Sequence, residues 1–287
     1  NQSVFSCQKT VSNICIRIIL DKMTTTLILT IVFIVLNVCI VFGNTPLKVI
    51  TREHNKRVYN DKGIGIIGGK NTTIQKHPYQ ASLLVNGYFF CAAVIVDKNY
   101  VLAMADCIYG APPPDIQVRV GSSHTASGGH LYDVESIQTH PNYSRASGPF
   151  DLGLIKVKKP IKFSKTVKKV RLATKDLPEN TSVVLSGWGF TGSYNDSEFQ
   201  EATVAGVSRS SCNATYEAYG HYVDATMICA SGDNSGPCEN DFGDPIVAKN
   251  KVYGLFSWAF NCADNEFPAV YASVPGCLDW IKKTIKS

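Results

Sequence analysis

Three short motifs contain acidic side chains that are candidates for acid–base catalysis. They read Leu102-Ala103-Met104-Ala105-Asp106-Cys107, Phe150-Asp151-Leu152-Gly153-Leu154-Ile155 and Cys238-Glu239-Asn240-Asp241-Phe242-Gly243-Asp244-Pro245. A carboxylate has a reference pKa of about 4, whereas histidine titrates near neutrality and can take and return a proton within one turnover. Acids are therefore poor bases toward a hydroxyl group, and Phe242, inside the third motif, carries no nucleophilic atom.

Together, these motifs resemble those of the trypsin-like serine proteases. In that family the third motif reads Cys-x-Gly-Asp-Ser-Gly-Gly-Pro and the first reads Leu-Thr-Ala-Ala-His-Cys, so Phe242 stands at the place of the attacking serine and Asp106 at that of the histidine. Asp151 matches the third triad residue, which orients the histidine. Losing a triad nucleophile or base costs on the order of a millionfold in turnover. The resemblance therefore implies a serine protease fold in which none of the three positions is catalytic.

The two carboxylates of the first and second motifs would crowd one site. Like charges at close range disfavour each other's ionisation, so we expect either Asp106 or Asp151 to have a raised pKa. One interpretation is a proton-sharing pair or a cation site; the other, which we favour, is a vestigial pair separated by water. Two carboxylates without further ligands are a weak indication of calcium, so we expect no metal or cofactor.

The oxyanion and activation residues of the resembled family are altered as well. Asn240 and Asp244 replace two glycines, the first of which helps to form the oxyanion hole. The run that begins Ile66-Ile67-Gly68-Gly69 resembles the mature amino terminus, whose ammonium would pair with Asp241. Gly65 stands where the family is cut after Arg or Lys. Since an unpaired buried carboxylate costs several kcal/mol, we expect either cleavage by an unusual protease or a zymogen-like domain.

The primary pocket also departs from the family pattern. Gly236, two residues before Cys238, stands where charge preference is set, so a pocket for Arg or Lys is not expected. Ala259 and Ala269 replace pocket-wall glycines and would narrow the slot. The segment Ser257-Trp258-Ala259 resembles the strand that pairs with substrate backbone, and it serves either as a strand-addition surface or only as framework.

The elements that must position these residues are short strands. Residues 80–84, 88–96, 100–103, 117–120 and 131–139 alternate in polarity and are rich in β-branched side chains, which predicts an all-β sandwich or barrel. The resemblance narrows this to two six-stranded antiparallel Greek-key barrels of the chymotrypsin type. A helix is predicted over 275–286, where Leu278, Ile281 and Ile285 share a face.

Cysteines and sequons indicate an oxidising, extracellular setting. Three of the ten cysteines, Cys7, Cys15 and Cys39, lie in segments that we expect to be absent from the mature protein. For the other seven, the resemblance implies the pairs Cys91–Cys107, Cys212–Cys229 and Cys238–Cys262. Cys277 is left over, as a buried free thiol or as a link to another chain. Five Asn-x-Ser/Thr sites favour a secreted glycoprotein; they begin at Asn71, Asn142, Asn180, Asn195 and Asn213.

The 287 residues divide by composition into a leader and one domain. We expect residues 1–22 to be an upstream segment absent from the native protein, 23–43 a signal peptide, 44–65 a short pro-segment and 66–287 the protease-like domain. The apolar stretch 27–42 is shorter than the roughly 20 residues that span a bilayer, so secretion is favoured over a signal anchor, with no membrane span in the mature form.

Charge is distributed unevenly along the chain. The net charge is +5, but residues 1–65 hold 8 Lys/Arg and 3 Asp/Glu, which leaves 20 of each in the remainder. A neutral domain gives no reason to expect nucleic acid or a membrane as partner. The stretch from Lys156 to Arg171 carries eight basic residues and no acid, and it is either a polyanion site or, as we favour, a solvated connection between the barrels.

These patterns lead to one main hypothesis and two alternatives. The main hypothesis is a secreted, non-catalytic serine protease homologue that binds a protease, an inhibitor or a substrate, for example as a cofactor or decoy in an extracellular proteolytic cascade. The first alternative is an active trypsin-like endopeptidase. The second is a secreted glycosaminoglycan-binding protein that uses the lysine-rich stretch.

Overall fold

The computed structural model describes residues 66–287 except 146–147, 190–197 and 239. The first half of this region forms a closed antiparallel barrel in the order β2-β3-β4-β7-β6-β5. Its strands are β2 (Gln80–Val85), β3 (Tyr88–Ile95), β4 (Tyr100–Ala103), β5 (Ile116–Val120), β6 (His130–Thr139) and β7 (Gly153–Val157). The five strand ranges predicted from the sequence match β2 to β6 within one residue at each end.

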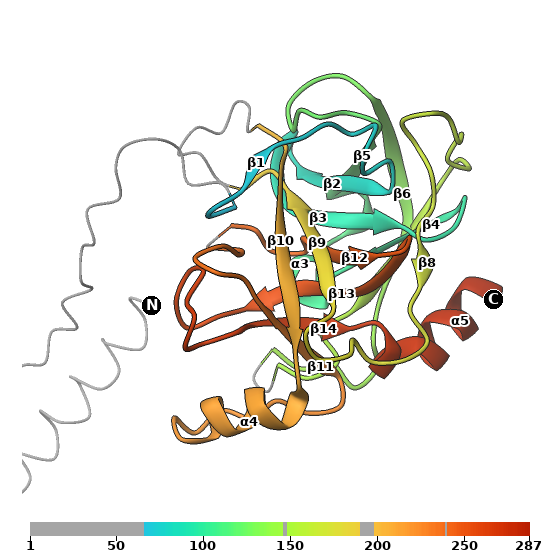
Figure 1. The fold of residues 1–287 in the computed structure, drawn as a ribbon. Coiled ribbons are helices and arrows are strands. Elements are labelled where there is room, and N and C mark those ends of the chain that lie inside the picture. The colour runs from blue at the N-terminus through green and yellow to red at the C-terminus, as the bar shows by residue number, and fades with distance from the viewer. Residues whose placement is uncertain (1–65, 146–147, 190–197, 239) are drawn as a thin grey trace, which may run out of the picture. The chain divides into compact units, whose positions relative to one another are not determined.

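The second half forms another barrel (Figure 1). It closes because β9 pairs with both β10 and β12. Its strands are β9 (Ser182–Gly187), β10 (Gln200–Val207), β11 (Met227–Ser231), β12 (Pro245–Ala248), β13 (Lys251–Trp258) and β14 (Ala269–Ser273). The short strands β1 (Lys70–Asn71) and β8 (Arg171–Leu172) add to β10 and β13. The predicted architecture of two six-stranded barrels is confirmed.

Alternating side chains build the interior of each barrel. In β5, Ile116, Val118 and Val120 are buried while the residues between them are half-exposed, as a strand with one face on a core requires. In β3 the pattern gives way to a fully buried run of five residues that ends at Ile95, since this strand is covered on both faces. Within that run, Ala92 packs in a separate buried cluster with Trp188.

The described residues also form five short helical segments. They are α3 (Ala105–Ile108), η1 (Pro113–Asp115), α4 (Arg209–Glu217), η2 (Pro275–Cys277) and α5 (Leu278–Lys286). The predicted terminal helix therefore begins as a 3-10 turn at Pro275 and becomes α-helical at Leu278. Ile281 is fully buried, and Leu278 and Ile285 on the same face are half-buried.

Three disulfides join the cysteine pairs that the resemblance implies: Cys91–Cys107, Cys212–Cys229 and Cys238–Cys262. Cys277 is a free thiol, 3% exposed. Across the described ranges, no helix has the length and apolar character needed to cross a bilayer. The expected upstream segment, signal peptide and pro-segment (1–65) and the sequon at Asn195 lie outside the described residues.

Candidate functional site

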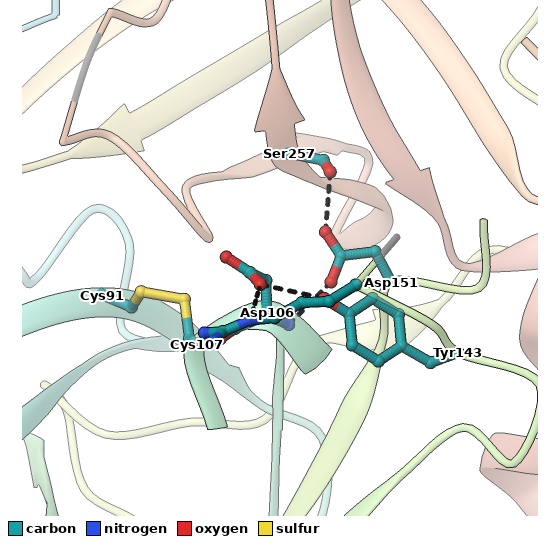
Figure 2. The surroundings of a disulfide bond; sticks show 7 residues. Cys91, Asp106, Cys107, Tyr143, Asp151 and Ser257 are labelled. Carbon is teal, nitrogen blue, oxygen red and sulfur yellow. Dashed lines mark hydrogen bonds and ion pairs between the residues drawn. A yellow bond between two sulfur atoms is a disulfide. The ribbon is translucent and has the colours of Figure 1, made fainter. Parts of the chain in front are cut away.

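The first two sequence motifs meet where the barrels face each other. Asp106 lies on α3, which the Cys91–Cys107 disulfide fastens to β3. Asp151 lies two residues before β7, which begins at Gly153. Figure 2 shows the Asp151 carboxyl between the backbone of Asp106 and the hydroxyl of Ser257 at the end of β13. Each barrel thus contributes to the surroundings of Asp151.

Asp151 is a buried carboxyl with donors on both oxygens. Its Oδ1 accepts the Asp106 backbone N–H at 2.8 Å, and its Oδ2 accepts the Ser257 hydroxyl at 2.7 Å. Burial raises the pKa of Asp151 to about 7, against the hydrogen bonds from Ser257 and from the Asp106 backbone, which lower it. The charge of Asp106 adds a smaller upward contribution. A raised pKa was expected here, but burial rather than crowding is its main cause.

Asp106 binds groups other than Asp151. Its Oδ1 accepts the Tyr143 hydroxyl at 2.9 Å and the Arg145 Nε–H at 2.8 Å. No hydrogen bond joins the carboxyl groups of Asp106 and Asp151 among the described residues, so the proton-sharing interpretation is not supported. The described residues also contain no cluster of three or more potential metal ligands.

Sequence reasoning did not identify Tyr143 or Arg145 as partners of Asp106. Both lie in the loop between β6 and β7. The only signal was a phenol and a guanidinium shortly before the Asp151 motif.

Phe242 presents an apolar ring at the place where the resemblance puts a nucleophile. Phe242 is 37% exposed, and its ring stacks nearly parallel on the ring of buried Phe256, with centroids 5.9 Å apart and an interplanar angle of 9°. Its carbonyl oxygen accepts the Ala92 N–H at 2.9 Å, which ties the loop to β3. Asn240, at the place of the oxyanion-hole glycine, has φ 76°, a left-handed conformation that asparagine tolerates better than most residues.

Asp241 and Asp244 form a buried acid pair, each 1% exposed. Asp241 Oδ2 accepts the Cys238 N–H at 2.7 Å. If the two groups are ionised, Asp241 Oδ1 and both Asp244 oxygens have no donor in the described part of the chain. Burial raises the pKa of Asp241 to about 7, and burial together with the charge of Asp241 raises the pKa of Asp244 well above its usual value. We infer that the two carboxyls share one proton. Such a proton supplies a hydrogen bond to oxygens that otherwise have no donor, and it leaves one acid neutral, in keeping with the raised pKa values.

Two further residues confine this acid pair. A Cβ on Gly187 would overlap the Asp244 carboxyl, so the glycine makes room for the acid. The buried Tyr271 hydroxyl has no hydrogen-bond partner among the residues that the structure describes, and the charges of Asp244 and Asp241 add to burial in raising its pKa. The sequence showed that Asp244 stands where the family motif has a glycine. It did not show that this acid would pair with Asp241.

The segment after the expected cleavage point packs against the base of the pocket. Ile66 is 3% exposed. Ile67 and Gly236 exchange two backbone hydrogen bonds, each 3.0 Å long. Gly236 and Ala269 line a hollow of about 10 Å³.

A larger apolar cavity, of about 230 Å³, lies toward the mouth of the pocket. Phe242, Trp258, Ala259 and Phe260 line it together with the Cys238–Cys262 disulfide. Rings at Tyr216, Tyr219, Phe267 and His221 surround Phe260 with centroid separations of 5.0–5.7 Å. Sequence reasoning did not predict this aromatic cluster, because its members come from three separate parts of the chain.

The remaining expected sites are placed as follows. The sequon residues Asn71, Asn142 and Asn180 are exposed, whereas Asn213 is half-buried in α4 and its Oδ1 accepts the Val223 N–H at 2.8 Å. Burial raises the pKa of Cys277 to about 12. A buried thiol of this kind favours the free-thiol interpretation over a link to another chain.

Comparisons with known proteins agree with this geometry. The family model described as Trypsin matches residues 66–281. The chain is 32% identical over 224 residues to trypsin epsilon of Drosophila erecta, covering 77% of this chain and 88% of that protein. It is 34% identical over 220 residues to trypsin delta of Drosophila melanogaster, covering 75% and 87%.

Two solved structures are similar in fold. The crystal structure of the scabies mite inactivated protease paralogue S-D1 has a TM-score of 0.71 and 32% identity, and the match covers 77% of this chain and 98% of that one. Neuropsin, a serine protease expressed in the limbic system of mouse brain, has a TM-score of 0.68 and 26% identity, with 76% and 98% covered.

Proposed function

The chain belongs to the trypsin family of serine proteases, and we propose that it is a member without peptidase activity that acts by binding another extracellular protein. The observation that carries this proposal is the Phe242 ring, which stacks on Phe256 and belongs to the residue that the motif resemblance aligns with the nucleophile. A phenyl ring has no oxygen or sulfur atom that could form an acyl intermediate.

The neighbour that would act as base supports the same proposal. Asp106 accepts hydrogen bonds from Arg145 and Tyr143, so the carboxyl oxygen that binds them is already engaged. Histidine is the side chain that takes and returns a proton near neutrality, and the sequence has no histidine at this position. Losing either group alone costs on the order of a millionfold in turnover.

A protease fold that has lost catalysis can still bind a protease, an inhibitor or a substrate. Three disulfides favour an oxidising, extracellular compartment. The apolar cavity beside Phe242 and Trp258 remains open to a partner. The similarity to a structure named as an inactivated protease paralogue adds support, whereas relatives named trypsins at 32% and 34% identity favour the alternative of an active endopeptidase.

A peptidase assay distinguishes these two functions. The chain is tested uncut and after engineered cleavage before Ile66, so that an unactivated zymogen cannot explain a negative result. We expect no hydrolysis of a fluorogenic peptide library in either form, with trypsin delta of Drosophila melanogaster as the active control. Turnover that copurifies with the chain and disappears in a Phe242→Ala variant would refute the proposal.

The binding half of the proposal has its own test. Immobilised, purified chain is used to capture proteins from the native secretion, and captured proteins are identified by amino-terminal sequencing. We expect a protease, a protease inhibitor or a protease substrate. The control is the same chain unfolded by reduction of its disulfides. If the folded chain captures none of these three classes of protein above the level of this control, a role in a proteolytic cascade is contradicted.

A further inference from the structure

A lysine-lined groove lies away from the residues discussed so far. It is a hollow of about 480 Å³, and its wall includes Lys76, Lys168, Lys169 and Lys249 but no aspartate or glutamate. All four lysines are exposed. None of them forms an ion pair with another residue in the part of the chain that the structure describes. The groove therefore gathers unneutralised positive charge from three separate segments.

The backbone that carries these lysines is fixed to both barrels. Lys168 N–H donates to the Pro78 carbonyl at 2.7 Å, just before β2. Two residues beyond the lysine pair, Arg171 N–H donates to the Asn250 carbonyl at 3.2 Å, and the Arg171 guanidinium donates to the Lys249 carbonyl at 2.8 Å. The groove is thus held in place before any ligand arrives, which reduces the entropy lost on binding.

The charge in the groove is local. Residues 66–287 hold equal numbers of basic and acidic side chains, so the domain as a whole has no long-range attraction for anions. Four unpaired ammonium groups around one hollow repel each other, and a bound polyanion would remove that repulsion. We therefore expect the affinity of the groove to depend on how the anionic groups of the ligand are spaced, rather than on the net charge of the domain.

We propose that this groove binds a sulfated polysaccharide. Lysine ammonium groups act as separate point charges, which suits sulfate groups spaced along a sugar chain. Single-stranded nucleic acid is recognised largely by stacking on aromatic rings, but the two rings in the groove wall, His77 and Tyr79, are buried. The disulfides favour a compartment in which polysaccharides are the abundant polyanions. This site is independent of the proposed loss of catalysis.

The groove also redefines the lysine-rich stretch found in the sequence. Only Lys168 and Lys169 of that stretch line it, joined by Lys76 and Lys249 from elsewhere. Lys156 instead pairs with Glu135 at 2.9 Å. The remaining exposed lysines of the stretch lie outside the groove wall and provide a matched control; they are Lys158, Lys159, Lys162 and Lys165.

The test compares two variants of the full secreted chain that lose the same number of charges. The groove variant changes Lys76, Lys168, Lys169 and Lys249 to Gln, and the control variant changes Lys158, Lys159, Lys162 and Lys165 to Gln. Affinity for a size-defined heparin oligosaccharide is measured by calorimetry over a series of salt concentrations. Thermal unfolding of each variant checks that the fold is intact, and a Lys168→Gln, Lys169→Gln pair provides a milder change.

We expect the wild type to show a slope of log affinity against log salt of roughly −3, because each neutralised charge on a flexible polyanion contributes about −0.7. The groove variant should lose at least about tenfold in affinity and most of that slope, and the control variant should keep both. Equal losses in the two variants, or no binding by the wild type, would overturn the proposal. If single-stranded DNA of equal charge binds as tightly as heparin, a sulfated polysaccharide is the wrong choice of ligand.

Discussion

Replacing Asp244 by asparagine should change how the stability of the domain depends on pH. In the folded state Asp241 and Asp244 are buried together and their pKa values are raised. The folded protein therefore holds a proton that the unfolded chain releases above about pH 4. This contribution to stability is fully present below about pH 4 and is lost as pH rises through the folded pKa of about 7. The wild type should become less stable across that window.

The size of the effect follows from Asp244 itself, whose pKa is raised well above its usual value by burial and by the charge of Asp241. An acid that stays protonated in the folded state but ionises in the unfolded chain loses about 1.4 kcal/mol of stability per pH unit, or roughly 4 kcal/mol between about pH 4 and 7. An asparagine at 244 can donate an amide N–H to the Asp241 carboxylate, so the variant needs no shared proton. It should lose up to about 4 kcal/mol less than the wild type between about pH 4 and 7.

Urea unfolding at several pH values measures this difference. Asp151 has a raised pKa as well, of about 7, but it is unchanged in the variant and drops out of the comparison. Asp115→Asn, which alters an exposed carboxyl on η1, serves as the control and should leave the wild-type pH dependence intact. If Asp244→Asn also keeps the wild-type pH dependence, the two carboxyls do not share a proton.

Three further outcomes are expected. Gly187→Ala should destabilise the domain by about 1–3 kcal/mol because its methyl group overlaps the Asp244 carboxyl; adding Asp244→Gly should recover much of the loss in chemical denaturation, and additive losses would contradict the contact. Combining Phe242→Ser with Asp106→His should not restore hydrolysis of a peptide ester or amide, since Asn240 and Asp244 remain; fluorophosphonate-sensitive turnover by this double variant would show otherwise. Cys277 should resist alkylation in the native protein and react once the protein is unfolded, because the thiol is buried. Equal rates of Cys277 alkylation in the folded and unfolded protein, followed by mass analysis, would disprove this.

Much of the fold was predictable because its signals are local. The strands of the first barrel carry alternating or continuous apolar runs, and the five from β2 to β6 were predicted to within one residue at each end. The ordered motifs around Asp106, Asp151 and Phe242 then identified the family without any structural information. Cysteine spacing alone did not determine the disulfides; their pairing came from the resemblance.

The electrostatics of the site were less predictable because they depend on contacts between distant segments. Arg145 and Tyr143 reach Asp106 only because the loop before β7 passes over α3. The pairing of Asp241 with Asp244 depends on burial, which motif matching does not reveal. The lysine groove likewise combines residues far apart in the sequence, so a count of charges along one stretch located only part of it.

The central claim is that no covalent acyl or phosphonyl intermediate can form at Phe242. Its most direct test is the intact mass of the purified chain, cut before Ile66, after exposure to an excess of a fluorophosphonate probe, with an active trypsin treated in parallel. We expect the mass of the chain to remain unchanged while the trypsin gains one adduct. A stoichiometric adduct on this chain would contradict the account.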